Sequence, residues 1–305
     1  METTLYQSFQ HHTSRGREMK QITVISGKGG TGKTSITAAF ASLASNAVLA
    51  DCDVDAADLH LILKPRILES SIFHGLKIAH INKNNCINCK KCHELCKFDA
   101  IDEDINLITE ACEGCGVCAH ICPVDAIRMV GRKSGIAYIS ETRFGPMAHA
   151  MLNTAEEASG KLVTVVRNNA KMIAQKKNKE LIVIDGPPGI GCPVISSLTG
   201  VDLVLIVTEP TLSAIHDLER ILGVAHYFHL PAVVCINKYD INIENTKKIE
   251  SYCNKNNIEI VGKIPYDNVI TDTMVNEKTI VEYSKGEITE RVSKMWRQIT
   301  KRLRT

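Results

Sequence analysis

Runs of aliphatic and β-branched residues alternate with helix-forming stretches along most of the chain. The segments that predict buried strands are QITVIS, NAVLAD, ELIVID, VDLVLIV, PAVVCIN and IEIVGKI. Helical patterns such as TSITAAFASLA and TLSAIHDLERI follow some of these runs. Strands alternating with helices predict an α/β fold with a mainly parallel sheet wrapped on both faces. Ligands of such sheets bind beyond the carboxyl ends of the strands, so the residues that end these runs are the first candidates for a site.

The composition is that of a soluble globular protein with a substantial core: 305 residues, 44% of them hydrophobic and 23% charged. The formal net charge of +2 gives no global reason to expect nucleic acid or an anionic membrane as the main partner. We find no apolar run long enough to span a bilayer and no secretory signal, which predicts a cytoplasmic protein. Residues 1–18 are interpreted as a disordered extension or as sequence upstream of a true start at Met19.

Eight of the twelve cysteines form two copies of the pattern C-x2-C-x2-C-x3-C, repeated with a period of 26 residues. Each copy continues into Asp-Ala-Ile, so the unit is an internal duplication. Because the thiols of cytosolic proteins are kept reduced, metal ligation is favoured over disulfides as the role of these cysteines. The spacing is that of bacterial ferredoxins with two 4Fe–4S clusters, in which the fourth cysteine of each run binds the other cluster. The predicted ligands are Cys86, Cys89, Cys92 and Cys122 for one cluster, and Cys112, Cys115, Cys118 and Cys96 for the other.

A pair of zinc knuckles is the alternative, but zinc sites of that kind usually show two separated C-x2-C pairs. Lys97 stands where the ferredoxin pattern usually has proline, which makes the turn less rigid and places a cation near one cluster without removing a ligand. Outside the duplication, Cys52, Cys235 and Cys253 lie in apolar patterns and are predicted to be buried thiols.

The segment QITVISGKGGTGKTSITAAFASLA predicts a strand, a glycine-rich turn and a helix, which is the context that a P-loop requires. The motif G-x4-G-K-S/T spans residues 27–34. Its glycines let backbone N–H groups and the helix N-terminus face phosphates, while Lys33 neutralises charge and the Thr34 hydroxyl binds Mg²⁺. The predicted nucleotide-binding residues are Gly27, Gly29, Gly30, Thr31, Gly32, Lys33, Thr34 and Ser35.

Lys28 directly follows the first glycine of this motif. With a lysine at that position, GKGGTGKT resembles the deviant Walker A motif of the MinD, ParA and Mrp ATPases, the arsenite-pump ATPase and the nitrogenase iron protein. In that superfamily the lysine reaches across a nucleotide-sandwiched dimer to the partner's phosphates. The resemblance implies an ATP-dependent dimer, of two copies or with a paired homologue, and catalytic roles for Lys28 and Lys33.

Two of the predicted strands end in carboxylates. By similarity to the D-x-D segment of the superfamily, Asp53 is expected to orient or polarise the attacking water. Asp51, Asp55 and Asp58 lie in the same loop, although acids at a strand end are otherwise simply solvated. Asp185 follows the strand LIVI and resembles the Walker B aspartate, which holds Mg²⁺ through water. Residues 186–191, GPPGIG, would form the second switch.

The tetrapeptide NKYD, residues 237–240, also fits the guanine-reading N-K-x-D pattern of GTPases, so GTP stays open as the alternative nucleotide. In the superfamily that the P-loop resembles, the asparagine contacts adenine, with help from the loop at residues 265–267. The resemblance therefore implies ATP, with Asn237, Pro265 and Asp267 as the base-contacting residues.

The resemblance narrows to MinD-superfamily P-loop ATPases that carry an inserted ferredoxin domain, and it covers essentially Met19 to the C-terminus. It implies a P-loop NTPase fold with a deviant Walker A motif plus an inserted α+β bacterial-type ferredoxin domain. The expected domains are residues 19–82 and 132–305 for the two parts of the ATPase and 83–131 for the insert. NKNN before Cys86 and GRKSG after Val130 are interpreted as linkers or turns.

The resulting hypothesis is an ATP-hydrolysing dimeric switch that gates electron transfer from two 4Fe–4S clusters to an unknown redox partner. One alternative is a carrier that assembles or delivers iron–sulfur clusters to apo-proteins, as the similar Mrp ATPases do. Another is a ParA-like or MinD-like positioning ATPase with a redox-sensing insert. No nucleic acid partner is expected.

Two features stay open at the level of sequence. Cys192 lies seven residues after Asp185, the offset of a cluster-binding cysteine in the nitrogenase iron protein. No matching second cysteine is evident, so Cys192 is interpreted as structural, or as a ligand shared across the dimer. The C-terminal helix carries an apolar stripe that either packs on the sheet, as expected, or seeks a membrane. The stripe is Ile288, Val292, Met295, Ile299 and Leu303.

Overall fold

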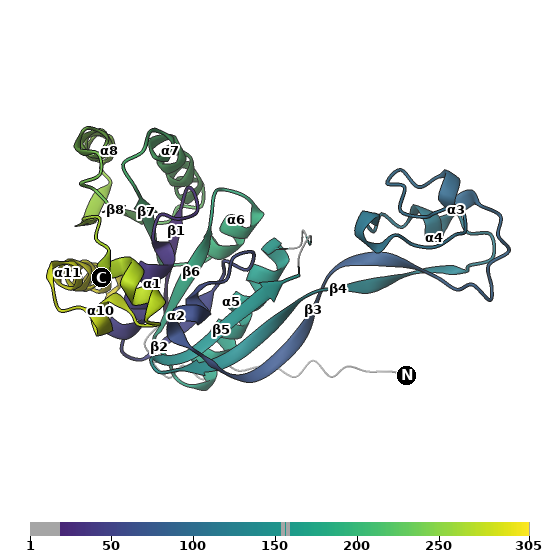
Figure 1. The fold of residues 1–305 in the computed structure, drawn as a ribbon, viewed down its shortest axis with the longest axis horizontal. Coiled ribbons are helices and arrows are strands. Elements are labelled where there is room, and N and C mark those ends of the chain that lie inside the picture. The colour runs from purple at the N-terminus through teal and green to yellow at the C-terminus, as the bar shows by residue number, and fades with distance from the viewer. Residues whose placement is uncertain (1–18, 154–155, 157–158, 305) are drawn as a thin grey trace, which may run out of the picture.

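One sheet organises the molecule, which the computed structural model describes at residues 19–153, 156 and 159–304. Within these residues nine strands lie in the order β3-β4-β5-β2-β6-β1-β7-β8-β9 (Figure 1). They are β1 (Lys20–Ser26), β2 (Ala47–Asp51), β3 (Arg66–Ile81), β4 (Ile127–Thr142), β5 (Gly145–Leu152), β6 (Leu181–Pro188), β7 (Leu203–Thr208), β8 (Ala232–Asn237) and β9 (Glu259–Ile264). All neighbours from β5 to β9 are parallel, and the β3–β4 and β4–β5 pairs are antiparallel. The predicted α/β fold with a mainly parallel sheet is confirmed.

Helices cover both faces of the parallel part because each buried strand points alternate apolar side chains to opposite sides. In β7, Leu205 belongs to the core cluster that also contains residues of α1, α2, α10 and α11. Val204 and Ile206 belong to the cluster on the other face, which contains residues of α5, α6, α7 and α8. The helices are α1 (Lys33–Leu43), α2 (Leu59–Leu63), α3 (Lys91–Glu94), α4 (Val117–His120), α5 (Ser159–Lys176), α6 (Cys192–Leu198), α7 (Leu212–Tyr227), α8 (Ile243–Lys255), α9 (Val269–Val275), α10 (Ile280–Tyr283) and α11 (Glu287–Arg304).

The apolar stripe of α11 is buried in the core between this helix and the sheet. Trp296 of α11 also packs on Phe40 of α1, with ring centroids 4.7 Å apart. The sheet-packed interpretation of the stripe is therefore confirmed, and its apolar side chains are already covered. Among the described helices, none is long and apolar enough to cross a membrane. Cys52, Cys235 and Cys253 are buried as predicted.

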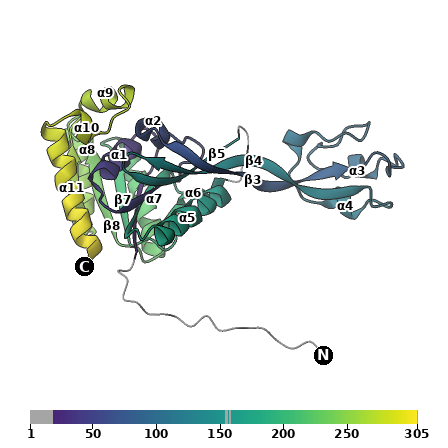
Figure 2. The same cartoon turned by 90° about the horizontal axis from the view of Figure 1, so that it is seen from below.

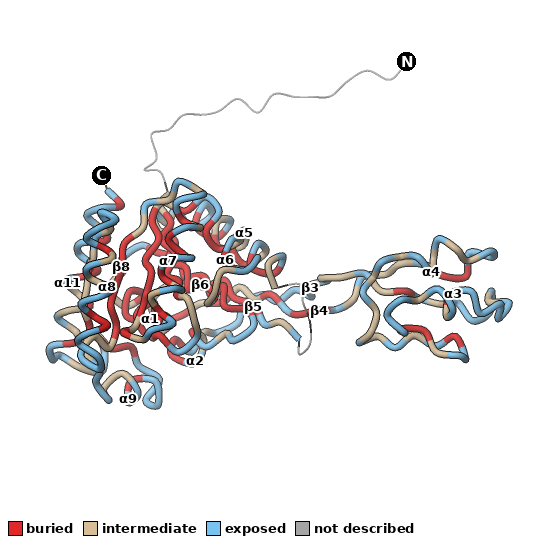
Figure 3. The backbone as a smooth tube through the Cα atoms, turned by 90° about the horizontal axis from the view of Figure 1, so that it is seen from above, coloured by how far each residue is buried: buried red, intermediate tan, exposed pale blue. Residues whose placement is uncertain are grey.

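The strands β3 and β4 are each 16 residues long and extend beyond the sheet as a two-stranded ribbon (Figures 1 and 2). The ribbon carries residues 82–126, here called the cysteine-rich lobe, at its far end. The Asn82 N–H donates to the Ala126 carbonyl (2.8 Å) where the lobe begins and ends. Ala79, Cys92, Ile101, Ile105 and Ile127 form a small core there. The burial view shows this lobe and ribbon as mostly exposed or partly exposed, in contrast to the buried strands of the main sheet (Figure 3).

The interpretation of GRKSG as a linker or turn is wrong. Residues 131–135 lie inside β4 and pair with β3, with irregular register between His74 and Lys77. Position 135 of this strand requires glycine, because a Cβ there would lie 2.6 Å from the Met151 carbonyl oxygen of β5. The glycines and polar residues of GRKSG suggested an end to the strand. Pairing with β3, more than 50 residues away in the chain, instead satisfies the backbone hydrogen bonds of this segment. The other proposed border, NKNN, does form a turn.

Candidate functional site

The glycine-rich turn joins the end of β1 to the start of α1 at the carboxyl edge of the sheet (Figure 1). Gly30 and Gly32 have φ angles of 76° and 91°, a conformation that glycine adopts without steric penalty. Gly32 is the N-cap of α1, so Lys33, Thr34 and Ser35 begin the helix. The turn and the first helical turn therefore present backbone N–H groups in the arrangement that binds phosphates.

Acidic residues of β6 and of the loop after β2 meet the P-loop around one buried lysine. Lys33 Nζ lies 3.5 Å from Asp53 Oδ2, and both side chains are less than a tenth exposed. Thr34 Oγ1 donates to Asp185 Oδ2 (2.7 Å), which brings together the two predicted magnesium-binding residues. Thr37 Oγ1 donates to Asp185 Oδ1 (2.9 Å). Thr37 was missed at the level of sequence; its only signal is its position one helical turn after Lys33.

Burial dominates the protonation of these carboxyls. It raises the pKa of Asp53 to about 6, a shift that Lys33 opposes and Asp185 reinforces. Burial likewise raises the pKa of Asp185, against the opposing effect of Lys33. Asp51 is held above its ordinary pKa by burial and by both neighbours, Asp185 and Asp53. A cluster of buried carboxyls with one lysine has the donor chemistry that suits a divalent cation such as Mg²⁺.

Asp51 organises the loop that follows β2. Its carboxylate accepts the backbone N–H groups of Asp53 (3.1 Å) and Leu59 (3.3 Å), the latter at the start of α2. Asp55 and Asp58 are exposed in the same loop, beside the fully buried Asp51. The four acids of this segment therefore occupy different environments, and Asp53 is the one paired with the P-loop lysine.

Lys28 is folded back onto its own chain. Its Nζ lies 2.6 Å from Glu209 Oε1 and donates to Thr211 Oγ1 (3.3 Å). Glu209 also pairs with Lys238 (3.2 Å), which donates to the Gly30 carbonyl (3.1 Å). Burial raises the pKa of Glu209, but the hydrogen bonds from Lys28 and Lys238 outweigh it, so the pKa lies below its ordinary value. Glu209 was missed at the level of sequence, although it follows directly after β7 at the ligand edge of the sheet.

The predicted base-contacting residues lie on two adjoining loops. Asn237 is buried beneath the P-loop, where its Nδ2 donates to the Thr31 carbonyl (2.8 Å). Its Oδ1 has no hydrogen-bond partner among the described residues. Tyr266 N–H donates to Asp240 Oδ1 (2.7 Å), which joins residues 237–240 to residues 265–267. Pro265 is partly exposed and Asp267 is exposed, whereas Asn237 supports the P-loop from below.

The contact between Asn237 and the P-loop makes Gly32 sensitive to substitution. A Cβ at Gly32 would lie 2.5 Å from Asn237 Nδ2, and φ is positive. We expect Gly32→Ala to lower the free energy of unfolding by ~1–3 kcal/mol, measured by urea denaturation. Gly29→Ala is the matched control, because no atom lies within 4 Å of its Cβ position, and its effect should stay within ~0.5 kcal/mol. Equal effects at both positions would contradict this account.

The lobe repeats its backbone as well as its sequence. Helices α3 and α4 occupy equivalent places in the two copies. Positive φ angles also recur at positions related by the 26-residue period. These pairs are Asn88 with Gly114, Lys90 with Gly116, and Asp99 with Asp125. The duplication is therefore structural, and five of these six positions carry glycine, asparagine or aspartate, the residues that left-handed turns favour.

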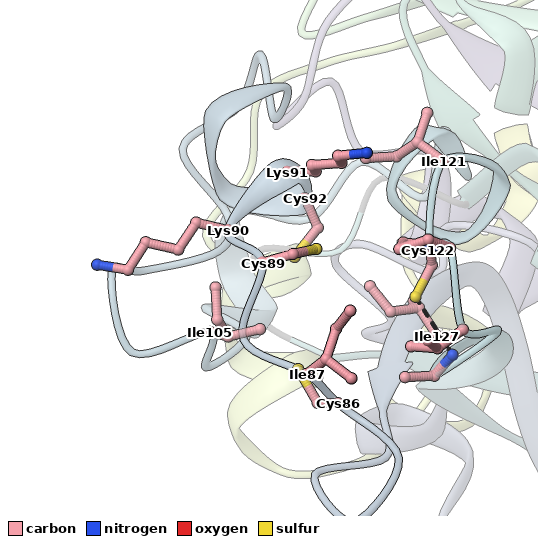
Figure 4. A pocket seen from close by; sticks show the side chains of 13 residues that line it. Cys86, Ile87, Cys89, Lys90, Lys91, Cys92, Ile105, Ile121, Cys122 and Ile127 are labelled. Carbon is pink, nitrogen blue, oxygen red and sulfur yellow. Dashed lines mark hydrogen bonds between the residues drawn. The ribbon is translucent and has the colours of Figure 1, made fainter.

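Two cavities in the lobe divide the eight cysteines into two sets of four. The first, of about 330 Å³ including its open mouth, is lined by Cys86, Cys89, Cys92 and Cys122 (Figure 4). The second, of about 350 Å³, is lined by Cys96, Cys112, Cys115 and Cys118. Each set thus contains three cysteines of one copy and the last cysteine of the other, the grouping that the spacing predicts.

Backbone N–H groups already point at the crossing thiols. Ala100 N–H donates to Cys96 Sγ (3.3 Å) and Ala126 N–H to Cys122 Sγ (3.2 Å), an equivalent pair in the two copies. Such bonds orient cluster ligands and tune cluster potentials. Among the described residues, no three His, Cys, Asp or Glu side chains converge on a single metal ion. A cubane cluster separates its four thiolates by its own iron and sulfide atoms, so cysteines around a cavity suit it better than they suit a zinc ion.

Cys192 begins α6 and is exposed. It is therefore not one of the buried core thiols, and its role as a structural cysteine or as a ligand shared across the dimer stays a prediction. Its place is at the end of the glycine-rich segment that follows β6.

Fold and site together define a P-loop nucleotide-binding protein, since the glycine-rich turn, buried lysine and acidic strand ends occupy one edge of a parallel sheet. The chain belongs to the CobQ/CobB/MinD/ParA nucleotide binding domain family, whose profile matches residues 22–280. Uncharacterized protein MJ0578 of Methanocaldococcus jannaschii is 36% identical over 285 residues, covering 92% of this chain and 96% of that protein. Uncharacterized protein MJ0579 of the same organism is 28% identical over 277 residues, covering 88% and 93%.

Solved structures agree on the fold. Septum site-determining protein MinD from Pyrococcus horikoshii, solved with Mg-ADP, superposes with a TM-score of 0.57 at 17% identity, covering 93% of this chain and 96% of that one. MinD of Aquifex aeolicus gives 0.55 at 20% identity, covering 92% and 97%. A shorter match, 40% identical over 53 residues, joins the chain to pyruvate synthase subunit PorD of Methanothermobacter marburgensis and covers 17% of this chain and 65% of that one.

Proposed function

We propose that this protein is an ATP-binding and ATP-hydrolysing dimeric switch that gates electron transfer through two 4Fe–4S clusters to a redox partner. The observation that carries the proposal is the pair of four-thiol cavities at the end of a ribbon whose strands continue into the nucleotide-binding sheet. The partial match to pyruvate synthase subunit PorD supports a link to redox metabolism.

At the nucleotide site, Lys33 would neutralise the phosphates and exchange its contact with Asp53 for them. Thr34 and Asp185 would hold Mg²⁺, replacing the hydrogen bond between them. Asp53, released from Lys33, would then orient water toward the terminal phosphate. Lys28 would leave Glu209 and reach the nucleotide of the partner in the dimer.

In the lobe, the two sets of cysteine thiolates would hold the clusters. A bound 4Fe–4S cluster accepts and returns single electrons. The N–H groups of Ala100 and Ala126 would stabilise negative charge on the Cys96 and Cys122 sulfurs. Four thiols around each cavity favour permanent clusters over cargo, which is why electron transfer is preferred to the carrier function.

A continuous set of contacts joins the Asp53 loop to the ribbon. His60 of α2 stacks on His149 of β5 (6.3 Å), which in turn stacks on Tyr138 of β4 (5.0 Å). Burial and the neighbouring His60 lower the pKa of His149 to about 4, so its ring is neutral at pH 7. Arg143, in the turn after β4, donates to the Ile62 and Leu63 carbonyls at the end of α2 (3.1 and 2.8 Å). Movement of the Asp53 loop would therefore reach β4, which runs to the lobe.

Dimer formation requires Lys28 to leave Glu209, so removing that carboxylate should favour the dimer. We expect Glu209→Gln to lower the protein concentration for half-dimerisation with ATP about 2–5-fold, because ion pairs of this exposure contribute up to ~1 kcal/mol. Analytical ultracentrifugation measures the change. Glu219→Gln, on the exposed face of α7, is the matched control and should have no effect. Weaker dimerisation of Glu209→Gln would show that Glu209 supports the P-loop instead.

Anaerobic EPR of the dithionite-reduced protein, with and without ATP and Mg²⁺, tests the proposed function after iron has been counted. About eight irons per chain are expected, with signals whose shape or potential changes when nucleotide binds. Intact clusters with unchanged signals would contradict gating. Activation of an apo-protein acceptor by cluster transfer would favour the carrier function instead.

A further inference from the structure

The mouth of the first cavity differs in charge from its surroundings. Lys90 and Lys91 both line this cavity, and no acidic residue does. Both lysines are exposed, and Figure 4 shows Lys90 extending away from the thiols while Lys91 runs toward Ile121. Ile87 and Val124 at the same mouth are 61% and 37% exposed. The mouth thus combines an uncovered apolar pair with two cations.

The second copy of the duplication serves as an internal comparison. Its cavity is lined by Glu113 and by no lysine or arginine. The residues equivalent to Lys90 and Lys91 there are Gly116 and Val117, and Glu113 replaces Ile87. The fold of the lobe therefore does not require lysines at these positions, and the two mouths carry opposite charge.

The lysines also stand out within the lobe. Residues 82–126 contain eight acidic residues and only four lysines. Lys83 is held elsewhere, because its Nζ donates to the Asp104 and Ile105 carbonyls (2.8 Å each). Half of the lobe's positive charge is therefore gathered at one cavity mouth. Such a local cationic patch selects acidic partners through complementary charge and faster encounter.

We propose that the mouth formed by Ile87, Lys90, Lys91 and Val124 is the docking surface for a small acidic electron-carrier protein. The inference rests on the proposed function, because a cluster in this cavity is what would bring such a partner there. The apolar pair supplies the contact that excludes water, and the lysines select the partner's charge. The acidic mouth of the second cavity would repel the same partner.

The test measures binding of an acidic plant-type 2Fe–2S ferredoxin, as probe, to the cluster-loaded protein by fluorescence anisotropy. At low ionic strength, Lys90→Glu and Lys91→Glu should each raise the Kd about 3–10-fold, and the difference should vanish at high salt. Lys97→Glu is the matched control, since it makes the same charge change at an exposed lysine that lines neither cavity, and it should raise the Kd less than about 2-fold.

Equal weakening by all three substitutions would overturn the proposal, because it would indicate diffuse attraction to the whole lobe. Failure of the probe to bind the wild-type protein, or preferential binding of the basic probe cytochrome c, would also overturn it. Iron content and EPR signals, recorded for every variant, report separately on the proposed function. If the clusters are retained but their EPR signals do not change with nucleotide, gating is contradicted. The docking proposal is then still decided by the Kd values of the variants.

Discussion

Replacing Cys122 with alanine is expected to remove the same iron–sulfur cluster as replacing Cys86. Both thiols line the first cavity, although they belong to different copies of the duplicated motif. A 4Fe–4S cluster that loses one of its four thiolate ligands is destabilised, so each variant should retain about half of the iron and one of the two EPR signals. Iron and acid-labile sulfide determination, followed by EPR after dithionite reduction, measures the loss.

The matching pair for the other cavity is Cys96 and Cys112. Cys96→Ala and Cys112→Ala should both remove the second signal and leave the first. Cys192→Ser is the control, because this exposed thiol lies outside the lobe and its loss should leave the iron content unchanged. If Cys122→Ala removes the signal lost in Cys112→Ala, each motif binds its cluster locally and the crossed assignment is wrong. A loss of iron in Cys192→Ser would reveal a further cluster ligand.

Replacing Lys33 with methionine is expected to reduce ATP hydrolysis by ~10²–10³-fold. Lys33 is 5% exposed and sits at the start of α1, where it would face the phosphates and stabilise the charge that develops during transfer. The steady-state rate of phosphate release at saturating ATP measures the effect. Turnover close to that of the wild type would show that Lys33 is not part of the hydrolytic site.

A structural effect of the same substitution has to be separated from the chemical one. Lys33→Met leaves Asp53 and Asp185 buried without their cation, which should lower the stability of the nucleotide-free protein by ~1–3 kcal/mol. The double variant Lys33→Met/Asp53→Asn removes both members of the ion pair. It should recover much of the stability in urea denaturation and none of the hydrolysis. Recovery of both would show that the loss of activity was a folding defect.

Local features of this protein follow from its sequence alone. The strand, glycine-rich turn and helix around residues 20–43 depend on residues within a few positions of one another, so pattern and turn chemistry predict them. The same holds for the two cysteine motifs, since their spacing is that of the ferredoxins in which the fourth cysteine binds the other cluster. The acidic residues at strand ends could be placed at one edge because parallel strands bring their carboxyl ends together.

Tertiary structure decided the contacts between distant segments. Strand alignment brings Glu209 to Lys28, places Asn237 beneath Thr31, and turns GRKSG into part of β4 rather than a linker. Each of these contacts depends on which distant segments of the chain pair with each other, and the local sequence pattern does not encode that choice. The charge difference between the two cavity mouths depends on both the sequence and the tertiary structure. The residues are visible in the sequence, but their position beside the thiols follows from how the duplicated lobe folds.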